Sequence, residues 1–127
     1  MTIDNDEPIL FVTPKGIKIW KNKQRKLHRL DGPAVEILDV YKEWRIDGKL
    51  HRTDGPAIEL ANGYKEWWVN GKFHRLDGPA VEFPGVSKSW FINDVELTKE
   101  EFNDWVQNND TEWNNELKTL FKLIYET

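Results

Sequence analysis

The chain has 127 residues and a net charge of −4, and it contains no cysteine. This length predicts one domain, and the acidic balance argues against general nucleic-acid binding, which needs a surplus of basic residues. Because the sequence has no cysteine, no apolar signal segment in its first ten residues and no apolar run near the length of a membrane span, we expect a soluble, cytoplasmic protein without disulfides.

A 23-residue repeat sets the organisation of the chain. The string HRLDGPAVE begins at His28, HRTDGPAIE begins at His51, and HRLDGPAVE begins again at His74. A degenerate unit that ends at Trp20 precedes these copies, and the pattern stops before Leu97, which stands where the next histidine is expected. We therefore predict a repeat array over residues 1–97 and a helical cap over residues 98–127.

Each repeat predicts a β-hairpin. The residues after each Pro-Ala pair alternate between apolar and polar, which is typical of a half-buried strand. A turn and a second strand follow, over residues 41–46, 64–69 and 87–92. The pairs Asp47-Gly48 and Asn70-Gly71 then predict tight turns, since both central positions favour a positive φ. The expected fold is mainly β with C-terminal α: a single-layer antiparallel sheet of repeated hairpins, capped by two helices.

The period of two divides each second strand between two faces. One face is regular and apolar, and we assign it to the core. It carries Trp44, Trp67 and Trp90 together with Ile46, Val69 and Ile92. The other face mixes aromatic and charged residues of the kinds that anchor protein interfaces. The candidate partner-binding residues on this face, called the aromatic face below, are Tyr41, Arg45, Tyr64, Trp68 and Phe91. The alternative is that the C-terminal helices cover it.

The C-terminal segment changes to a helical period. Thr98 followed three residues later by Glu101 is a capping box, and Phe102, Trp105 and Val106 then share one helix face. A second helix is expected from about Thr111. Its apolar stripe consists of Trp113, Leu117, Leu120, Phe121 and Ile124. Since the ends of a repeat array need covering, we expect both helices to cap the last hairpin.

The repeated His-Arg-x-Asp set is the most suggestive polar feature. It consists of His28, Arg29, Asp31, His51, Arg52, Asp54, His74, Arg75 and Asp77, called the ladder below. In a structural interpretation, each Asp caps a turn or pairs with Arg, and each His packs on Trp or bonds a backbone carbonyl. In a functional interpretation, Arg forks and His donors bind a small anion. Strict repetition favours the structural interpretation, and the spacing predicts no metal site.

The hairpin period, the string HR-x-DGPA and the later W-x-[IV]-[ND]-G-K resemble MORN-type repeats. They are similar in particular to a MORN-like repeat of bacteriophage proteins, and the resemblance covers residues 14–97. It implies an elongated, twisted antiparallel sheet that acts as a binding platform and not as a catalytic fold. By analogy with small phage proteins, it also implies a host protein as the partner.

The known enzyme motifs are missing from the sequence: it has no G-x-S-x-G, no P-loop, no G-x-G-x-x-G and no H-E-x-x-H. We therefore predict a non-enzymatic protein with no catalytic residues and no cofactor. Its expected function is to bind a protein, and under the phage resemblance to inhibit a host protein such as a defence factor. The alternatives are a small-anion or nucleotide binder that uses the ladder, and a structural or self-assembling module that uses exposed sheet edges. The oligomeric state stays open.

Overall fold

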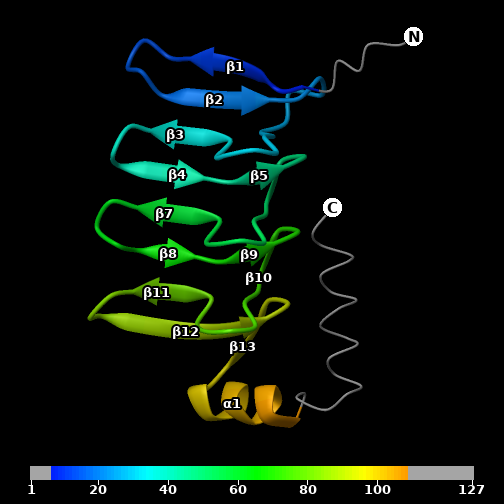
Figure 1. The fold of residues 1–127 in the computed structure, drawn as a ribbon, viewed down its shortest axis with the longest axis vertical. Coiled ribbons are helices and arrows are strands. Elements are labelled where there is room, and N and C mark those ends of the chain that lie inside the picture. Colours follow the sequence, from blue (N-terminus) through cyan, green and yellow to red (C-terminus); the bar gives the residue numbers. More distant parts are fainter. Residues whose placement is uncertain (1–6, 109–127) are drawn as a thin grey trace.

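The computed structural model describes residues 7–108. Its main element is a nine-stranded antiparallel sheet whose strand order follows the chain, so the molecule is elongated across its strands (Figure 1). In spatial order the strands are β1 (Ile9–Val12), β2 (Lys18–Lys21), β3 (Val35–Ile37), β4 (Tyr41–Glu43), β7 (Ile58–Leu60), β8 (Lys65–Glu66), β11 (Val81–Phe83), β12 (Ser87–Ile92) and β13 (Val95–Leu97). The predicted sheet of antiparallel hairpins is confirmed.

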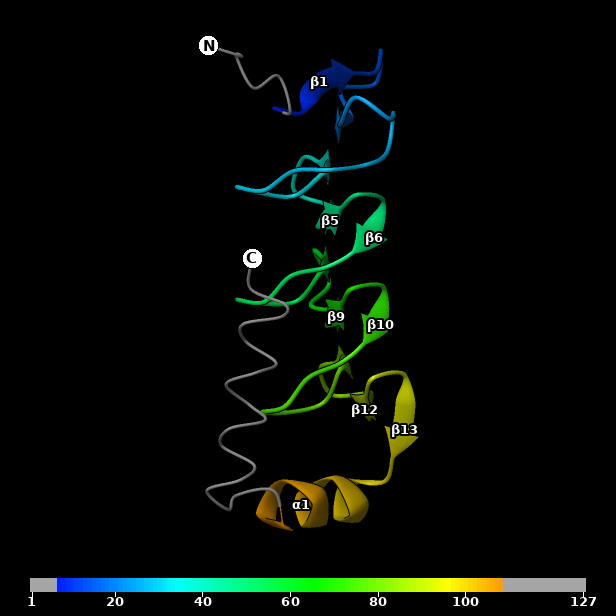
Figure 2. The ribbon, with the colours of Figure 1, turned by 90° about the vertical axis from the view of Figure 1, so that its right-hand side faces the viewer.

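Two short side hairpins accompany the main sheet. They pair β5 (Arg45–Ile46) with β6 (Lys49–Leu50), and β9 (Trp68–Val69) with β10 (Lys72–Phe73). Seen along the sheet, β6, β10 and β13 lie on one side, and the long loops between repeats project from the other side (Figure 2). Each of the first two repeats therefore contributes two strands to the sheet and one hairpin beside it, whereas the third contributes β11, β12 and β13 to the sheet itself.

The second strand of the first two repeats is interrupted, which corrects the predicted continuous strands over residues 41–46 and 64–69. The Trp44 N–H donates to the carbonyl of Ala57 in the next repeat, while the Trp44 carbonyl accepts from the N–H of His51. The backbone thus changes partner at Trp44, from β7 to β6, and Trp67 does the same with Ala80 and His74. In the third repeat the first half of β12, residues 87–89, pairs with β11, and the second half, residues 90–92, pairs with β13. This strand therefore runs unbroken, as predicted.

The turns that close the side hairpins have the predicted geometry. Asp47 and Gly48 have φ values of 49° and 82°, and Asn70 and Gly71 have 51° and 75°. Positive φ at both central positions matches the right-handed twist of the flanking strands, and Asn, Asp and Gly tolerate it best. These turns send the chain back toward the next His-Arg-x-Asp segment.

The core is a narrow column built from the alanine of each DGPA string. Ala34, Ala57 and Ala80 are fully buried. The Ala57 N–H donates to the Glu66 carbonyl at 2.7 Å, and its own carbonyl accepts from Trp44 at 2.8 Å, so the backbone of this residue links neighbouring strands. A larger side chain would separate those strands, which explains the small residue at this repeat position.

The end of the array carries a helix, α1 (Lys99–Asn108). The capping box is confirmed: the Glu101 N–H donates to Thr98 Oγ1 at 3.1 Å, and the Thr98 N–H donates to Glu101 Oε1 at 2.9 Å. Phe102 is buried, Trp105 and Val106 are half-buried, and α1 packs against β12 and β13. The second predicted helix lies outside the described residues. Within residues 7–108, no helix has the length and apolar character needed to cross a membrane.

Candidate functional site

The arginines of the ladder are stacked on tryptophans. The guanidinium carbon of Arg29 lies 3.9 Å from the centre of the Trp20 ring, and the corresponding distances are 3.8 Å for Arg52 over Trp44 and 3.7 Å for Arg75 over Trp67. Trp20 therefore plays the role of the repeat tryptophans, as its place in the degenerate unit predicted. Of the indoles on the face assigned to the core, Trp44 and Trp67 are half-buried beneath these cations, and Trp90 is half-buried.

The glycine of each DGPA string lies on the other side of the same guanidinium. A Cβ added at Gly55 would come within 2.8 Å of the Arg52 guanidinium carbon, and Gly32 and Gly78 stand in the same relation to Arg29 and Arg75. Each arginine is thus held between an indole and a glycine, where a cation and an aromatic face attract each other. This contact explains why Gly follows Asp in every copy.

Two nitrogens of each ladder arginine, Nε and Nη1, also donate hydrogen bonds. Arg52 Nε donates to Asp54 Oδ1 at 2.9 Å, and its Nη1 donates to the Pro56 carbonyl at 3.0 Å and to Glu59 Oε1 at 3.2 Å. The first two of these bonds recur at Arg29 and Arg75. The positive charge of each guanidinium therefore already faces a carboxylate of its own repeat.

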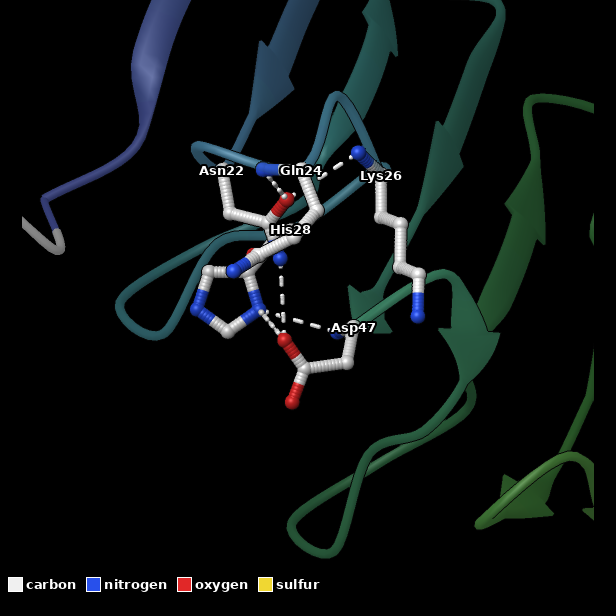
Figure 3. A network of polar contacts seen from close by, with 5 residues as sticks. All are labelled: Asn22, Gln24, Lys26, His28 and Asp47. Atoms are coloured by element: carbon white, nitrogen blue, oxygen red, sulfur yellow. Dashed lines mark hydrogen bonds and ion pairs between the residues drawn. The ribbon is translucent and has the colours of Figure 1, made fainter.

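The ladder histidines accept hydrogen bonds from the backbone of the side-hairpin turns. The Asp47 N–H donates to His28 Nδ1 at 2.9 Å, and Asn70 and Asn93 donate to His51 and His74 at 3.0 Å (Figure 3 shows the first of these). Because an N–H group donates to Nδ1 in each case, this nitrogen is the acceptor and the proton of the neutral ring lies on Nε2. Burial lowers the pKa of His74.

The first side hairpin is tied to the basic connector that precedes it. Asn22 Nδ2 donates to Asp47 Oδ1 at 2.9 Å, and the Asn22 side-chain oxygen accepts from the N–H groups of Gln24 and Lys26 (Figure 3). These bonds fix the connector 21–26 as an ordered turn beside His28. The bonds around His28 thus hold the fold together, as the structural interpretation of the ladder expects.

The aromatic face is assembled as predicted, but its residues bond to one another. In β4 and β5, Tyr41 donates to Glu43 at 2.7 Å, and Arg45 pairs with the same carboxylate, which is only 8% exposed. In the next repeat Tyr64, just before β8, and Trp68, in β9, both donate to Glu66. Burial, with this hydrogen bond, raises the pKa of Tyr64 to about 12.

An aromatic column completes this face. The Phe73 ring, from β10, lies 3.8 Å from the ring centre of Trp68 and 4.8 Å from that of Phe91. Sequence reasoning missed Phe73, although its place after Asn-Gly-Lys in the repeat is visible in the sequence. All five candidate residues of the aromatic face are half-buried, and their first role is to hold the side hairpins against the sheet.

Exposed apolar side chains also lie on the turns of the main hairpins. Leu38 is 77% exposed, Val40 56% and Val86 71%. With the exposed Ala61 and Pro84, they form what we call the turn ridge, along the left-hand side of the sheet in Figure 1. The Ala61 N–H donates to the Val40 carbonyl at 3.0 Å, so successive turns are stacked on each other. Sequence reasoning missed this ridge, whose signal is aliphatic residues at turn positions.

A second feature is an open groove of about 610 Å³ between the first two long loops, which project together in Figure 2. Trp44 and Ile46 lie in it, and the Arg29–Asp31 and Arg52–Asp54 pairs line its sides. Leu30, which is 73% exposed, stands at its edge. The groove is therefore walled by cations that their own carboxylates neutralise.

Within residues 7–108, no group of three or more His, Cys, Asp or Glu side chains is arranged to hold a metal ion. No known protein family, curated protein or solved structure shows a significant match to the chain.

Proposed function

We propose that this chain is a non-catalytic protein-binding module and that it contacts its partner through the turn ridge. The observation that carries the proposal is the exposure of Leu38, Val40 and Val86 on stacked turns, where Asn, Gly and Asp are the usual residues. Contiguous exposed apolar surface is typical of interaction sites. Burying an aliphatic side chain contributes about 1.5–3 kcal/mol, so these three residues are able to anchor an interface.

Contacts between successive turns support the turn ridge as the binding surface. A hydrogen bond joins Ala61 to Val40, and a Cβ added at Gly63 would lie 3.2 Å from Pro84 Cγ, so the three turns contact one another in series. A ridge held by backbone contacts loses little conformational entropy when a partner binds. The partner that fits it is a protein with a complementary apolar groove.

The ladder favours this function over anion or nucleotide binding. Each arginine is neutralised by an aspartate of its own repeat and stacked on an indole. Each histidine uses its unprotonated nitrogen to hold a turn. An anion would have to displace these bonds, whereas the turn ridge is exposed without any rearrangement. Inhibition of a host protein, which the MORN-like phage resemblance implies, is the more specific form of the proposal.

Site-specific photocrosslinking in the cells that naturally produce the chain tests the proposal. A benzophenone amino acid at Val40 or Val86 should give a discrete covalent adduct with one protein, and the same probe at exposed Lys72, on the distant β10, should not.

The ridge can then be altered next to the probe. Leu38→Ser with Val86→Ser should remove the adduct from a probe at Val40. The control variant Val95→Ser, which makes another exposed valine polar outside the ridge, should keep it. An adduct that survives the ridge substitutions, an equal adduct at Lys72, or no adduct at any ridge position contradicts the proposal.

A further inference from the structure

The strand β1 forms the outer edge of the sheet. Within the described part of the chain it pairs only with β2. Its four residues, Ile9 to Val12, are all apolar, and each is between 46% and 58% exposed. The opposite end of the array carries α1, which packs on β12 and β13. The two ends therefore differ, and the apolar one has the open edge (Figure 1).

The register shows which backbone groups face that edge. Phe11 lies opposite Ile19, and two residues farther along the Thr13 N–H donates to the Ile17 carbonyl at 3.0 Å. Hydrogen-bonded pairs alternate along an antiparallel ladder, so Ile9, Phe11 and Thr13 bond toward β2. The N–H and C=O groups of the residues between them, Leu10 and Val12, point away from the sheet.

Two prolines bound this edge. Pro8 and Pro14 fall at the same alternate positions as Leu10 and Val12, the positions whose backbone groups face the open edge. Neither proline has an N–H group to offer there. The open edge consequently offers two donors, those of Leu10 and Val12, placed symmetrically about Phe11. The segment from Pro8 to Pro14 also contains no charged residue.

We infer that β1 is a dimerisation edge and that its partner is the β1 strand of a second copy of this chain. In an antiparallel pair centred on Phe11, Leu10 of each copy lies opposite Val12 of the other, and every donor finds a carbonyl acceptor. Four backbone hydrogen bonds result, and the two Phe11 side chains meet across the symmetry axis in a close, non-hydrogen-bonded pair. No like charges oppose each other.

The geometry closes the assembly at two copies. Among residues 7–108, β1 is the open apolar edge of each chain, and joining the two copies of it consumes both, which makes the interface isologous. The two nine-stranded sheets would then form one continuous sheet with α1 at each end. The prolines limit the pairing to a short strand, as expected of an edge protected against extended aggregation.

Cysteine crosslinking tests the register, because the chain has no native cysteine. In a non-hydrogen-bonded pair the two Cα atoms lie about 4.5 Å apart, which suits a disulfide. Phe11→Cys should therefore form a covalent dimer on mild oxidation. Leu38→Cys, at an apolar position on the turn ridge that is more exposed than Phe11 (77% against 49%), should stay monomeric under the same conditions. Failure of Phe11→Cys to crosslink, or equal crosslinking of both variants, overturns the inference.

Sedimentation velocity at increasing protein concentration provides a second readout. The unmodified chain should show a monomer–dimer equilibrium between about 1 and 100 µM, by mass action. Leu10→Lys with Val12→Lys should abolish the dimer, since it places four like charges at the edge. Leu38→Lys with Val40→Lys adds the same charge elsewhere and should leave the dimer intact. A monomer at every concentration, or loss of the dimer in the turn variant, contradicts the inference.

Discussion

The contact between Arg52 and Gly55 offers a sharp test of how each repeat is held together. Gly55→Ala would place a methyl group 2.8 Å from the guanidinium carbon, and Gly55 does not have a positive φ that would itself resist alanine. Overpacking of this kind costs about 1–3 kcal/mol. If the arginine moves instead, it loses a cation–π contact worth about 0.5–2 kcal/mol, and its bonds to Asp54 and Pro56 weaken.

We therefore expect Gly55→Ala to lower the free energy of unfolding by about 2 kcal/mol. For an m-value of about 2 kcal/mol/M, the urea midpoint should fall by about 1 M. The control is the same substitution in an Arg52→Ala background. There the methyl group meets no guanidinium, and replacing glycine by alanine should be neutral or stabilising by up to about 1 kcal/mol.

The double-mutant cycle isolates the contact, because the two residues touch directly. Equal losses from Gly55→Ala in the presence and absence of Arg52 would refute the reasoning, since the cost would then come from the backbone. A midpoint unchanged by the single substitution would refute it as well.

The remaining predictions concern the buried polar groups. Arg45→Ala leaves the buried Glu43 carboxylate without its cation and should lower the free energy of unfolding by about 3 kcal/mol, measured in urea; adding Glu43→Gln should restore most of this loss, and no restoration would count against the pair. Because burial lowers the pKa of His74, the unfolded chain binds the proton more readily, and stability should fall as the pH drops below about 6.5. His74→Asn keeps an acceptor that does not titrate and should flatten this pH dependence, seen by comparing urea midpoints at pH 7.5 and 5.5; an unchanged slope would exclude His74 as its source.

The repeats made the fold predictable because each turn has a local cause. Asp47-Gly48 and Asn70-Gly71 specify their conformation without reference to distant residues, and so does the capping box at Thr98. The interruption at Trp44 has no local cause. It follows from the arrival of Ala57 in the next repeat, and propensity within one strand carries no information about that neighbour.

The candidate site was predicted less completely. Alternation correctly grouped Tyr41 with Arg45, yet it could not show that Glu43 lies between them and engages both. The hydrogen bonds of the ladder histidines could not be predicted from residue type alone. A neutral histidine can accept from an N–H group through one ring nitrogen or donate to a carbonyl through the other. Exposure of Leu38 and Val86 contradicts the usual polarity of turns, and this conflict between position and residue type is the observation on which the proposed interface rests.

The bonds from Trp44 to Ala57 and from Asn70 to His51 have a consequence for how such a protein changes its length. The first joins adjacent copies and the second lies within one copy, and the equivalent bonds recur one period later, from Trp67 to Ala80 and from Asn93 to His74. A duplication of residues 51–73 would therefore preserve all of these partnerships while inserting two more strands, about 10 Å of added height at the usual interstrand spacing. The number of 23-residue repeats therefore sets the separation between β1 and α1, and evolution or design can change it one repeat at a time.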